Sequence, residues 1–296
     1  MKLLVFGKNG QVGHELQHSL AGLGAVVALD RQDCDLARSD SIRAAIRAHA
    51  PDVIINAAAY TAVDRAESEP GPAMAINGVA PGVIGEEAAK LGALVVHYST
   101  DYVFDGKLDR PYVETDATNP QSVYGRSKLA GEVALAQSGA RHLILRTSWV
   151  VGAHGGNFAK TILRLARERD SLNVVADQWG APTTAALIAT VTAQLVGRYG
   201  VDDAFPFGIY HLAAAGETNW HGYAQHVVGA ARAAGLALKL VPEAIRPVAT
   251  PEYPSPAARP ANSRLCTAKL RGTFGLDLPD WQAALEPILE QIFQES

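Results

Sequence analysis

A tyrosine and a lysine four residues apart, Tyr124 and Lys128, are the side chains in this sequence best placed to do chemistry. They open a predicted helix over residues 124–137, and the i, i+4 spacing puts both side chains on one helix face. An ammonium close to a phenol favours the phenolate, so we expect the pKa of Tyr124 to fall from about 10 toward neutrality. Such a pair is suited to moving a proton to or from an oxygen of a bound molecule.

Two hydroxyl side chains, Ser99 and Thr100, stand at the end of an apolar run that predicts a buried strand. In a doubly wound sheet, ligands bind outside the carboxyl ends of the strands. A hydroxyl at this place could bridge the tyrosine and a substrate carbonyl. The preceding strand ends in Asn56 and three alanines, whose small side chains leave room where a cofactor would cross the sheet.

Three glycines, Gly7, Gly10 and Gly13, directly follow the first predicted strand and open a helix. This GxxGxxG spacing allows a tight turn and lets a pyrophosphate sit on the free N–H groups of a helix N-terminus. Asp30 and Arg31 stand at the end of the second strand. The acid suits a ribose hydroxyl and the guanidinium suits a 2′-phosphate, so the pair predicts a dinucleotide and leaves NAD against NADP open.

The elements that must position these residues alternate between short apolar runs and amphipathic stretches. Buried strands are predicted at 2–6, 25–29, 52–56, 93–99 and 142–147, and helices at 11–23, 39–49, 72–91 and 124–137. Further on we expect helices at 157–169, 184–198 and 220–234, a strand at 209–213, and a C-terminal helix at 280–294 interrupted at Pro287. Six prolines between residues 242 and 260 exclude a helix or a central strand there.

This order predicts an α/β protein with a Rossmann-type doubly wound parallel sheet and a smaller, mixed C-terminal substrate-binding domain. We expect the dinucleotide-binding domain over residues 1–150, rejoined by about 180–215 and by the C-terminal helix. The smaller domain then takes about 151–180 and 216–275.

Composition narrows the class of protein further. The 296 residues carry a net charge of −4, 48% hydrophobic and 19% charged residues, which is typical of a folded protein with no electrostatic footprint for nucleic acid. No run is long enough for a membrane helix, and the first residues do not read as a signal peptide. Cys34 and Cys266 form neither a disulfide framework nor a zinc spacing. We expect a cytoplasmic protein with reduced thiols.

The glycine loop, the alanines after Asn56, the hydroxyl after the fourth strand and the YxxxK pair together resemble the extended short-chain dehydrogenase/reductases. Within that superfamily the sequence is most similar to the dTDP-4-dehydrorhamnose reductases. The stretches that carry this resemblance are 56–67, 97–106, 123–132, 145–149, 157–161, 177–183 and 259–265, and the similarity runs in register from residue 1 to about 285.

The resemblance implies hydride delivery from NADPH, with NADH also usable, to the 4-keto group of dTDP-4-dehydro-β-L-rhamnose. The product is dTDP-β-L-rhamnose, made in the last step of its biosynthesis. Tyr124 would donate the proton, Lys128 would tune its pKa and anchor the ribose, and Thr100 would be the hydroxyl partner. The implied cofactor contacts are Gly7, Gly10, Gln11, Val12, Gly13, Asp30, Arg31, Asp35, Leu36, Ala59, Tyr60, Thr61 and Tyr98, with Tyr124 and Lys128. The implied substrate contacts are Thr100, Asp101, Tyr102, Trp149, Asn157 and Arg259, with Phe158 beside them.

The resemblance also raises the questions of a metal and of a partner subunit. Some relatives hold Mg²⁺ between subunits through glutamates, and Glu15 suits that role. Ala185 and Ala186 offer no acid where its counterpart is expected, so we assign no metal ligand and keep Glu15 as the sole candidate. A homodimer is compatible with the sequence, and a dTDP-sugar is the expected small-molecule partner.

Two other functions stay open on this fold. A sugar-nucleotide dehydratase needs an acidic pair after the strand-four threonine, and here Asp101 is followed by Tyr102. A 4-epimerase needs little beyond the same tyrosine, hydroxyl and tightly held cofactor, and the residues around 99–106 argue against it. A non-catalytic regulatory subunit, like that of methionine adenosyltransferase, is disfavoured because Thr100, Tyr124 and Lys128 are all present.

Overall fold

The centre of the molecule is a six-stranded sheet in which every strand pair is parallel. The computed structural model describes residues 1–202 and 204–294. The strands lie in the order β10-β5-β4-β3-β1-β2. Their bounds are β1 (Lys2–Phe6), β2 (Ala25–Leu29), β3 (Val53–Asn56), β4 (Leu94–Thr100), β5 (Arg141–Thr147) and β10 (Gly208–His211). This confirms the predicted α/β class with a Rossmann-type parallel sheet.

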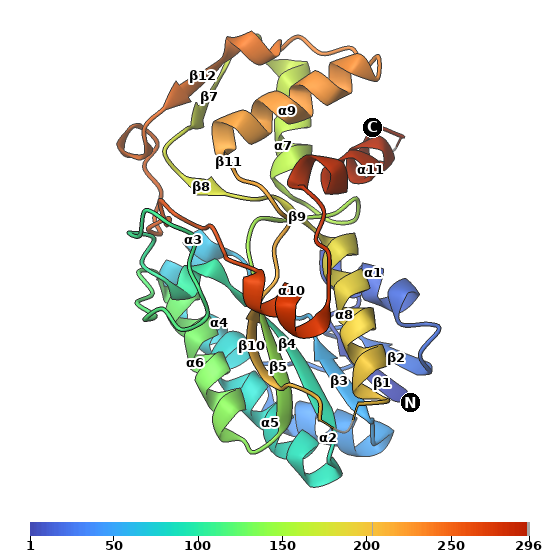
Figure 1. Cartoon of the computed structure of the whole chain (residues 1–296). Coiled ribbons are helices and arrows are strands. Elements are labelled where there is room, and N and C mark those ends of the chain that lie inside the picture. Colours follow the sequence, from blue (N-terminus) through green and yellow to red (C-terminus); the bar gives the residue numbers. More distant parts are fainter. Residues whose placement is uncertain (203, 295–296) are drawn as a thin grey trace.

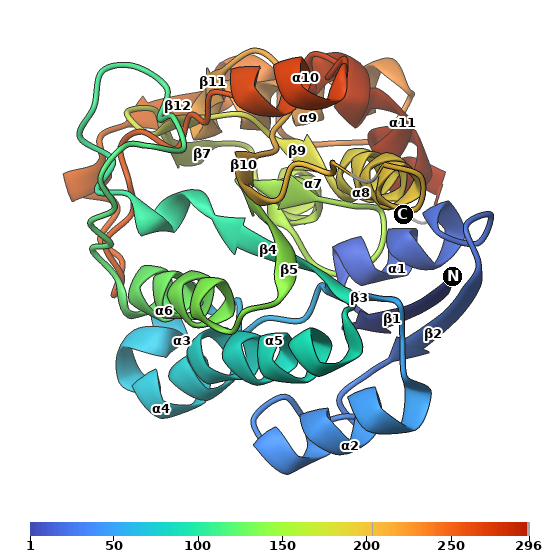
Figure 2. The same cartoon turned by 60° about the horizontal axis from the view of Figure 1, so that its bottom comes forward.

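Helices cover both faces of this sheet, which is why most residues of its strands are apolar. On one face lie α1 (Gln11–Ser19), α8 (Ala185–Tyr199) and α10 (Ala268–Phe274). On the other lie α2 (Ser39–His49), α5 (Ala80–Leu91) and α6 (Val123–Gln137), and Figure 2 shows the two layers on either side of the sheet. The two apolar clusters between helices and sheet hold β4 in place. Thr100 ends β4, and Tyr124 and Lys128 lie on α6.

The helix expected over residues 72–91 is divided in the structure. After α3 (Val63–Ser68) come α4 (Pro70–Ala73), a π-helical segment (Met74–Val79) and then α5. Asn77 in the π-helical segment donates its side-chain amide to the Tyr60 carbonyl and to the Ser127 hydroxyl, both at 3.0 Å. Gly131 of α6 packs directly against the Asn77 carbonyl. The wider turn of the π-helical segment therefore lies where α6 comes close to it.

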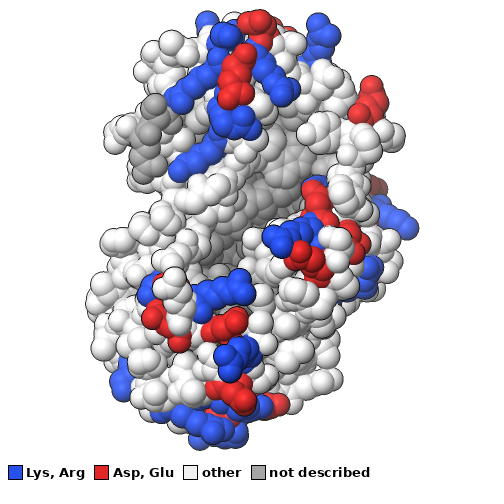
Figure 3. Space-filling model, turned by 180° about the vertical axis from the view of Figure 1, so that it is seen from behind, with Lys and Arg blue, Asp and Glu red and all other residues white. Residues whose placement is uncertain are grey.

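A second lobe lies beyond the carboxyl ends of the strands (Figure 1). It contains α7 (Phe158–Glu168), α9 (Trp220–Ala233) and α11 (Trp281–Gln294), which share one apolar cluster. Three two-stranded sheets among the described residues connect or extend it: β7 (Leu172–Val175) with β12 (Ile245–Val248), β8 (Trp179–Gly180) with β11 (Thr218–Asn219), and β6 (Val150–Val151) with β9 (Thr183–Thr184). Figure 3 shows a hollow in the surface between the two lobes.

The C-terminal helix differs from the expectation in two ways. It packs with α7 and α9 through Trp281, Leu285 and Ile288, whereas we expected it to rejoin the nucleotide-binding part. It also continues unbroken through Pro287. A proline removes one helical hydrogen bond, and burial of the apolar face of α11 offsets that loss. The helix that does return to the large sheet is α10, through Leu270 and Phe274.

The proline-rich stretch forms the edge strand β12 and two short 3₁₀ turns, Pro242–Ala244 and Thr250–Glu252. None of the helices among the described residues is both long and apolar enough to cross a membrane.

Candidate active site

The glycine loop between β1 and α1 has the shape of an anion cradle. Gly7 has a φ of 89°, and a Cβ on it would lie 2.7 Å from the Ala58 amide nitrogen. A Cβ on Gly13 would meet the Gly7 carbonyl. Gly10 precedes α1 and makes no side-chain cap, which leaves the first-turn N–H groups of the helix facing out of the loop. A side chain at Gly7 or Gly13 would fill this cradle. Because both positions are glycine, the cradle stays open and fits a pyrophosphate.

Asp30, directly after β2, accepts from four donors, of which two, Lys8 and Asn9, belong to this loop. Its Oδ1 accepts the backbone N–H groups of Gln32 (2.8 Å) and Asp33 (3.2 Å), and its Oδ2 accepts from Asn9 (3.2 Å) and Lys8 (3.2 Å). The backbone N–H of Asp33, followed by that of Gln32, lowers the pKa of Asp30 to about 2. A carboxylate offers about four acceptor positions, so a ribose hydroxyl would have to share Asp30 with Lys8 or Asn9.

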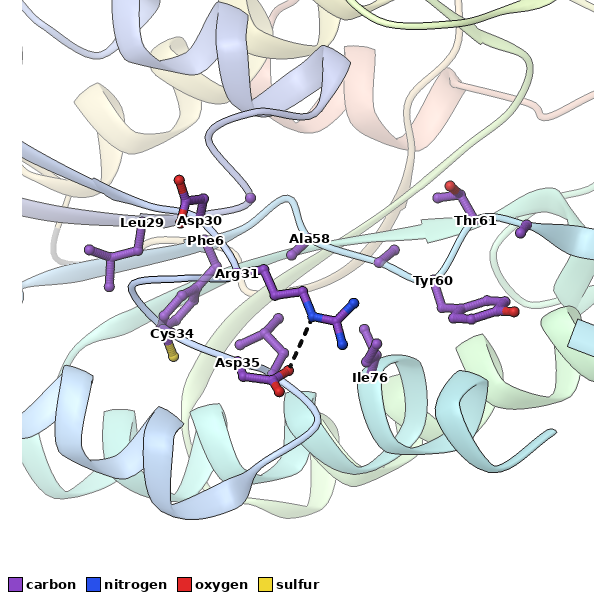
Figure 4. Close-up of a pocket in the computed structure, with 14 residues that line it drawn as sticks. Phe6, Leu29, Asp30, Arg31, Cys34, Asp35, Ala58, Tyr60, Thr61 and Ile76 are labelled. Atoms are coloured by element: carbon purple, nitrogen blue, oxygen red, sulfur yellow. Dashed lines mark ion pairs between the residues drawn. The ribbon is translucent and has the colours of Figure 1, made fainter. Parts of the chain in front are cut away.

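A cavity of about 310 Å³ opens beside Asp30, between the end of β2 and the segment after β3. Arg31 reaches across it toward Asp35, at 3.9 Å between Nε and Oδ1, and lies near Ile76 (Figure 4). The Arg31 side chain is 82% exposed, so it is free to turn toward a bound anion. Eight of the residues expected at the cofactor line this cavity: Gly7, Asp30, Arg31, Asp35, Leu36, Ala59, Tyr60 and Thr61.

Tyr98 does not face this cavity with its side chain. Its hydroxyl shares a 2.7 Å hydrogen bond with Thr192 of α8, inside the apolar cluster on the opposite face of the sheet. Only its backbone carbonyl points toward α6, where it accepts from Lys128 at 2.6 Å. Adjacent residues of β4 point to opposite faces of the sheet, so the Tyr98 side chain lies on the α8 face while that of His97 lies on the α6 face.

Tyr124 and Lys128 lie on the first turns of α6, whose start is capped by the Ser122 hydroxyl accepting the Gly125 N–H at 3.1 Å. Lys128 is 2% exposed, and burial lowers its pKa to about 8. Burial, and after it the charge of Asp101, raises the pKa of Tyr124 to about 12. The pKa of Tyr124 is thus raised in this structure, where we expected it to fall. The ammonium of Lys128 is directed to the Tyr98 carbonyl, so it does not offset the burial of the phenol.

The end of β4 places three predicted residues next to this phenol. The Thr100 hydroxyl donates to Asp101 Oδ1 at 3.0 Å and accepts the Tyr102 N–H at 3.2 Å. The Tyr102 ring meets the Tyr124 ring edge-on, with 5.4 Å between centroids. Asp101 is 3% exposed, its Oδ2 lacks a partner in the described part of the chain, and burial raises its pKa to about 6. A polar molecule in the cleft would find a hydroxyl, a phenol and a carboxyl side by side.

The second lobe supplies an aromatic wall on the other side of the cleft. Trp149 has a φ of 48° and stacks on Trp220, with 3.7 Å between ring centroids. Phe158 packs on Trp220 at 4.6 Å. Gly180 lies so close to the Trp149 ring that a Cβ would come within 2.7 Å of it. The strained backbone of Trp149 is thus held by the packing of its ring against Trp220 and Gly180.

Asn157 and Arg259 have polar partners that the sequence did not reveal. Asn157 caps α7 and also donates its side-chain amide to Gln11 at 3.1 Å, which ties the phosphate loop to the second lobe. The Arg259 guanidinium donates to Asp64 of α3 at 2.7 Å. Sequence reasoning missed Asp64 and Trp220. Asp64 lies within the stretch 56–67 that carries the family resemblance, while Trp220 shows no signal in the sequence.

No cluster of three or more His, Cys, Asp or Glu side chains in the described part of the chain could hold a metal ion. Glu15, the one residue considered for such a role, lies on α1.

A glycine cradle under a Rossmann-type sheet, with Tyr124, Lys128 and Thr100 at the carboxyl end of β4, defines an extended short-chain dehydrogenase/reductase. The chain matches the family model described as the RmlD substrate binding domain over residues 1–293. It is 50% identical to the dTDP-4-dehydrorhamnose reductase of Burkholderia thailandensis over 288 residues (96% of this chain, 97% of the relative). It is 49% identical to that of Escherichia coli K12 over 297 residues (99% and 98%).

Solved structures agree with these sequence comparisons. A dTDP-4-dehydrorhamnose reductase from Clostridium acetobutylicum superposes with a TM-score of 0.89 at 35% identity, covering 98% of this chain and 99% of that one. The Bacillus anthracis reductase in complex with NADP gives 0.86 at 32% identity, covering 100% and 99%. The chain belongs to the dTDP-4-dehydrorhamnose reductase family.

Proposed function

We propose that this protein reduces the 4-keto group of dTDP-4-dehydro-β-L-rhamnose to give dTDP-β-L-rhamnose, with NADPH favoured over NADH. The observation that carries the proposal is the placement of the buried Tyr124 phenol, at the start of α6, beside the Thr100 hydroxyl at the carboxyl end of β4. Reduction of a ketone needs a proton donor at the developing alkoxide, and a phenol with its pKa near 12 holds that proton until the alkoxide forms.

The residues of the glycine cradle would hold the cofactor by its phosphates. Gly7, Gly10, Gln11, Val12 and Gly13 surround the start of α1, where N–H groups are free to bind the pyrophosphate. The adenosine end would occupy the cavity lined by Asp30, Arg31, Asp35, Leu36 and the segment 59–61. When bound, the reduced nicotinamide supplies the hydride that the protein's own side chains cannot provide.

The side chains around the cleft would orient the sugar nucleotide and complete the proton transfer. Thr100 places a hydroxyl beside the tyrosine, and Lys128 offers a cation one helix turn away from it. Further contacts to the deoxysugar nucleotide would come from Asp101, Tyr102, Trp149, Asn157 and Arg259. The Trp149–Trp220 stack is an apolar wall for a sugar face, and Arg259, held by Asp64, is a cation for a diphosphate.

A coupled assay tests the proposal. The 4-keto sugar is generated from dTDP-glucose by the dehydratase and the 3,5-epimerase, and the chain is added with NADPH or NADH. We expect nicotinamide absorbance to fall and the product to be dTDP-L-rhamnose by mass and NMR. Formation of the C4 epimer, or no oxidation of either cofactor while the protein is folded, would reject this function.

A further inference from the structure

A buried histidine lies beside Lys128 and takes no part in the chemistry described above. His97 on β4 is 1% exposed, and its Nε2 lies 3.4 Å from the lysine Nζ. Its Nδ1 lies 3.1 Å from Nδ2 of Asn56, the residue that pairs with it in register across β3 and β4. Asn56 is also 1% exposed. Three polar side chains, Asn56, His97 and Lys128, thus form a continuous line through the core.

The hydrogen bonds fix which ring nitrogen of His97 carries the proton. The Ala58 N–H donates to Asn56 Oδ1 at 3.3 Å, so the NH₂ group of that amide must face the ring. Nδ1 of His97 therefore accepts. Burial, and the neighbouring Lys128 charge, hold the pKa of His97 well below its ordinary value, so the ring is neutral. A neutral imidazole has one N–H, which here must be on Nε2 and face Lys128.

A ring N–H that faces Lys128 interacts differently with the ammonium and with the neutral amine of this lysine. An ammonium has only donors, so it cannot accept this N–H, whereas a neutral amine has a lone pair that can. The Tyr98 carbonyl, 2.6 Å from Nζ, can accept from either form. The separation of 3.4 Å between Nζ and Nε2 is longer than a usual hydrogen bond of about 3 Å, which is compatible with a ring N–H on Nε2.

The other titratable groups around Lys128 do not remove this effect. Glu132, one turn further along α6, favours the ammonium, but its carboxylate is in a bidentate pair with Arg146 of β5 at 2.6 and 2.9 Å. Tyr124 on the preceding turn is neutral, and Asp101 lies beyond it at the end of β4.

We propose that Asn56 and His97 are positioning residues for Lys128, which bring its amine and ammonium forms close in energy so that it can return a proton to Tyr124. The proposal rests on the proposed reductase function. When the Tyr124 O–H bond breaks, its proton goes to the substrate oxygen. A Lys128 N–H then breaks and its proton goes to the phenolate. The amine left behind accepts the His97 Nε2–H, and water later restores the ammonium.

The first test measures the tautomer in the protein without cofactor or substrate. Long-range ¹H–¹⁵N NMR of the histidine rings at pH 7 is compared between wild type and His97→Gln, which identifies the His97 signal by its loss. We expect a neutral ring protonated at Nε2. A ring protonated at Nδ1, or a charged ring, would overturn the proposal whatever the protein's activity.

The second test asks whether the pair acts on Lys128. In His97→Gln the side-chain carbonyl can accept from the ammonium, so the pKa of Lys128 should rise. The fall of kcat/KM with rising pH, expected near pH 8 in the wild type, should move up by about one pH unit. At pH 7 kcat should drop about tenfold while the Kd for NADPH, measured by fluorescence, stays within twofold. Asn56→Ala frees the ring to accept at Nε2 and should shift the profile in the same direction.

His211→Gln is the matched control. His211 is an equally buried histidine of the same sheet, on β10, whose Nδ1 lies 3.1 Å from the Tyr112 carbonyl. It should leave the pH profile unchanged. If both His97→Gln and Asn56→Ala fold and keep the wild-type profile, the pair does not act on Lys128. If the wild type itself does not reduce the ketosugar, the proposed function fails, and the pH dependence of urea unfolding in wild type and His97→Gln reports the Lys128 pKa instead.

Discussion

Replacing Lys128 by methionine should stabilise this protein at neutral pH. The lysine is 2% exposed, and its pKa falls from 10.5 to about 8 because burial disfavours the charged form. Holding the ammonium in the fold at pH 7 therefore costs about 3 kcal/mol. Methionine fills a similar volume without charge but loses the hydrogen bond to the Tyr98 carbonyl, worth about 1 kcal/mol. We expect a net gain of about 2 kcal/mol.

The same linkage fixes how the gain depends on pH. Between about pH 8 and 10.5 an unfolded lysine binds a proton that the folded one has lost, so wild-type stability from this group rises with pH over that window. At pH 9.5 about 1.5 kcal/mol of the cost remains, which the lost hydrogen bond nearly cancels. The advantage of Lys128→Met should thus shrink by about 2 kcal/mol between pH 7 and 9.5.

Urea unfolding followed by circular dichroism at the two pH values measures this difference. Lys239→Met, at an exposed lysine, is the control and should change stability by less than about 0.5 kcal/mol at either pH. The reasoning is refuted if Lys128→Met is less stable than wild type at pH 7, or if its effect on the unfolding free energy is the same at both pH values. His97→Gln, which should raise the Lys128 pKa, should flatten the pH dependence of the wild type.

Three further outcomes follow from the geometry of the site. Tyr124→Phe should lower kcat about 10²–10⁴-fold, because the proton donor is gone, while fluorescence titration shows an unchanged Kd for NADPH; turnover within about threefold of wild type would remove Tyr124 from the catalytic role. Gly13→Ala should weaken NADPH binding more than tenfold, since its Cβ meets the Gly7 carbonyl, whereas Gly22→Ala, with open space around it, should not. Arg31→Ala should lower kcat/KM about tenfold for NADPH and leave NADH unaffected, and equal losses with both would show that Arg31 does not bind the 2′-phosphate.

The local sequence determined the sheet and the phosphate loop. Runs of Val, Ile and Leu without alternation predicted strands buried on both faces, and β1 to β5 formed within a residue or two of the predicted bounds. Glycine spacing after β1 was equally informative, because only a residue without a Cβ fits where Gly7 approaches Ala58. In these segments the residue types that identify a strand or a turn are neighbours in the sequence, so the sequence alone is enough to predict the element.

Tertiary structure alone decided the protonation of the site and the contacts that close the cleft. The i, i+4 spacing put Tyr124 and Lys128 on one face, but their pKa values depend on burial and on the Tyr98 carbonyl, which belongs to a strand 30 residues away. The Arg259–Asp64 pair joins residues 195 apart in the sequence. Packing of its apolar face on the second lobe likewise lets α11 continue past Pro287 without a break. Desolvation and long-range pairing depend on what the rest of the chain brings alongside, so no local pattern records them.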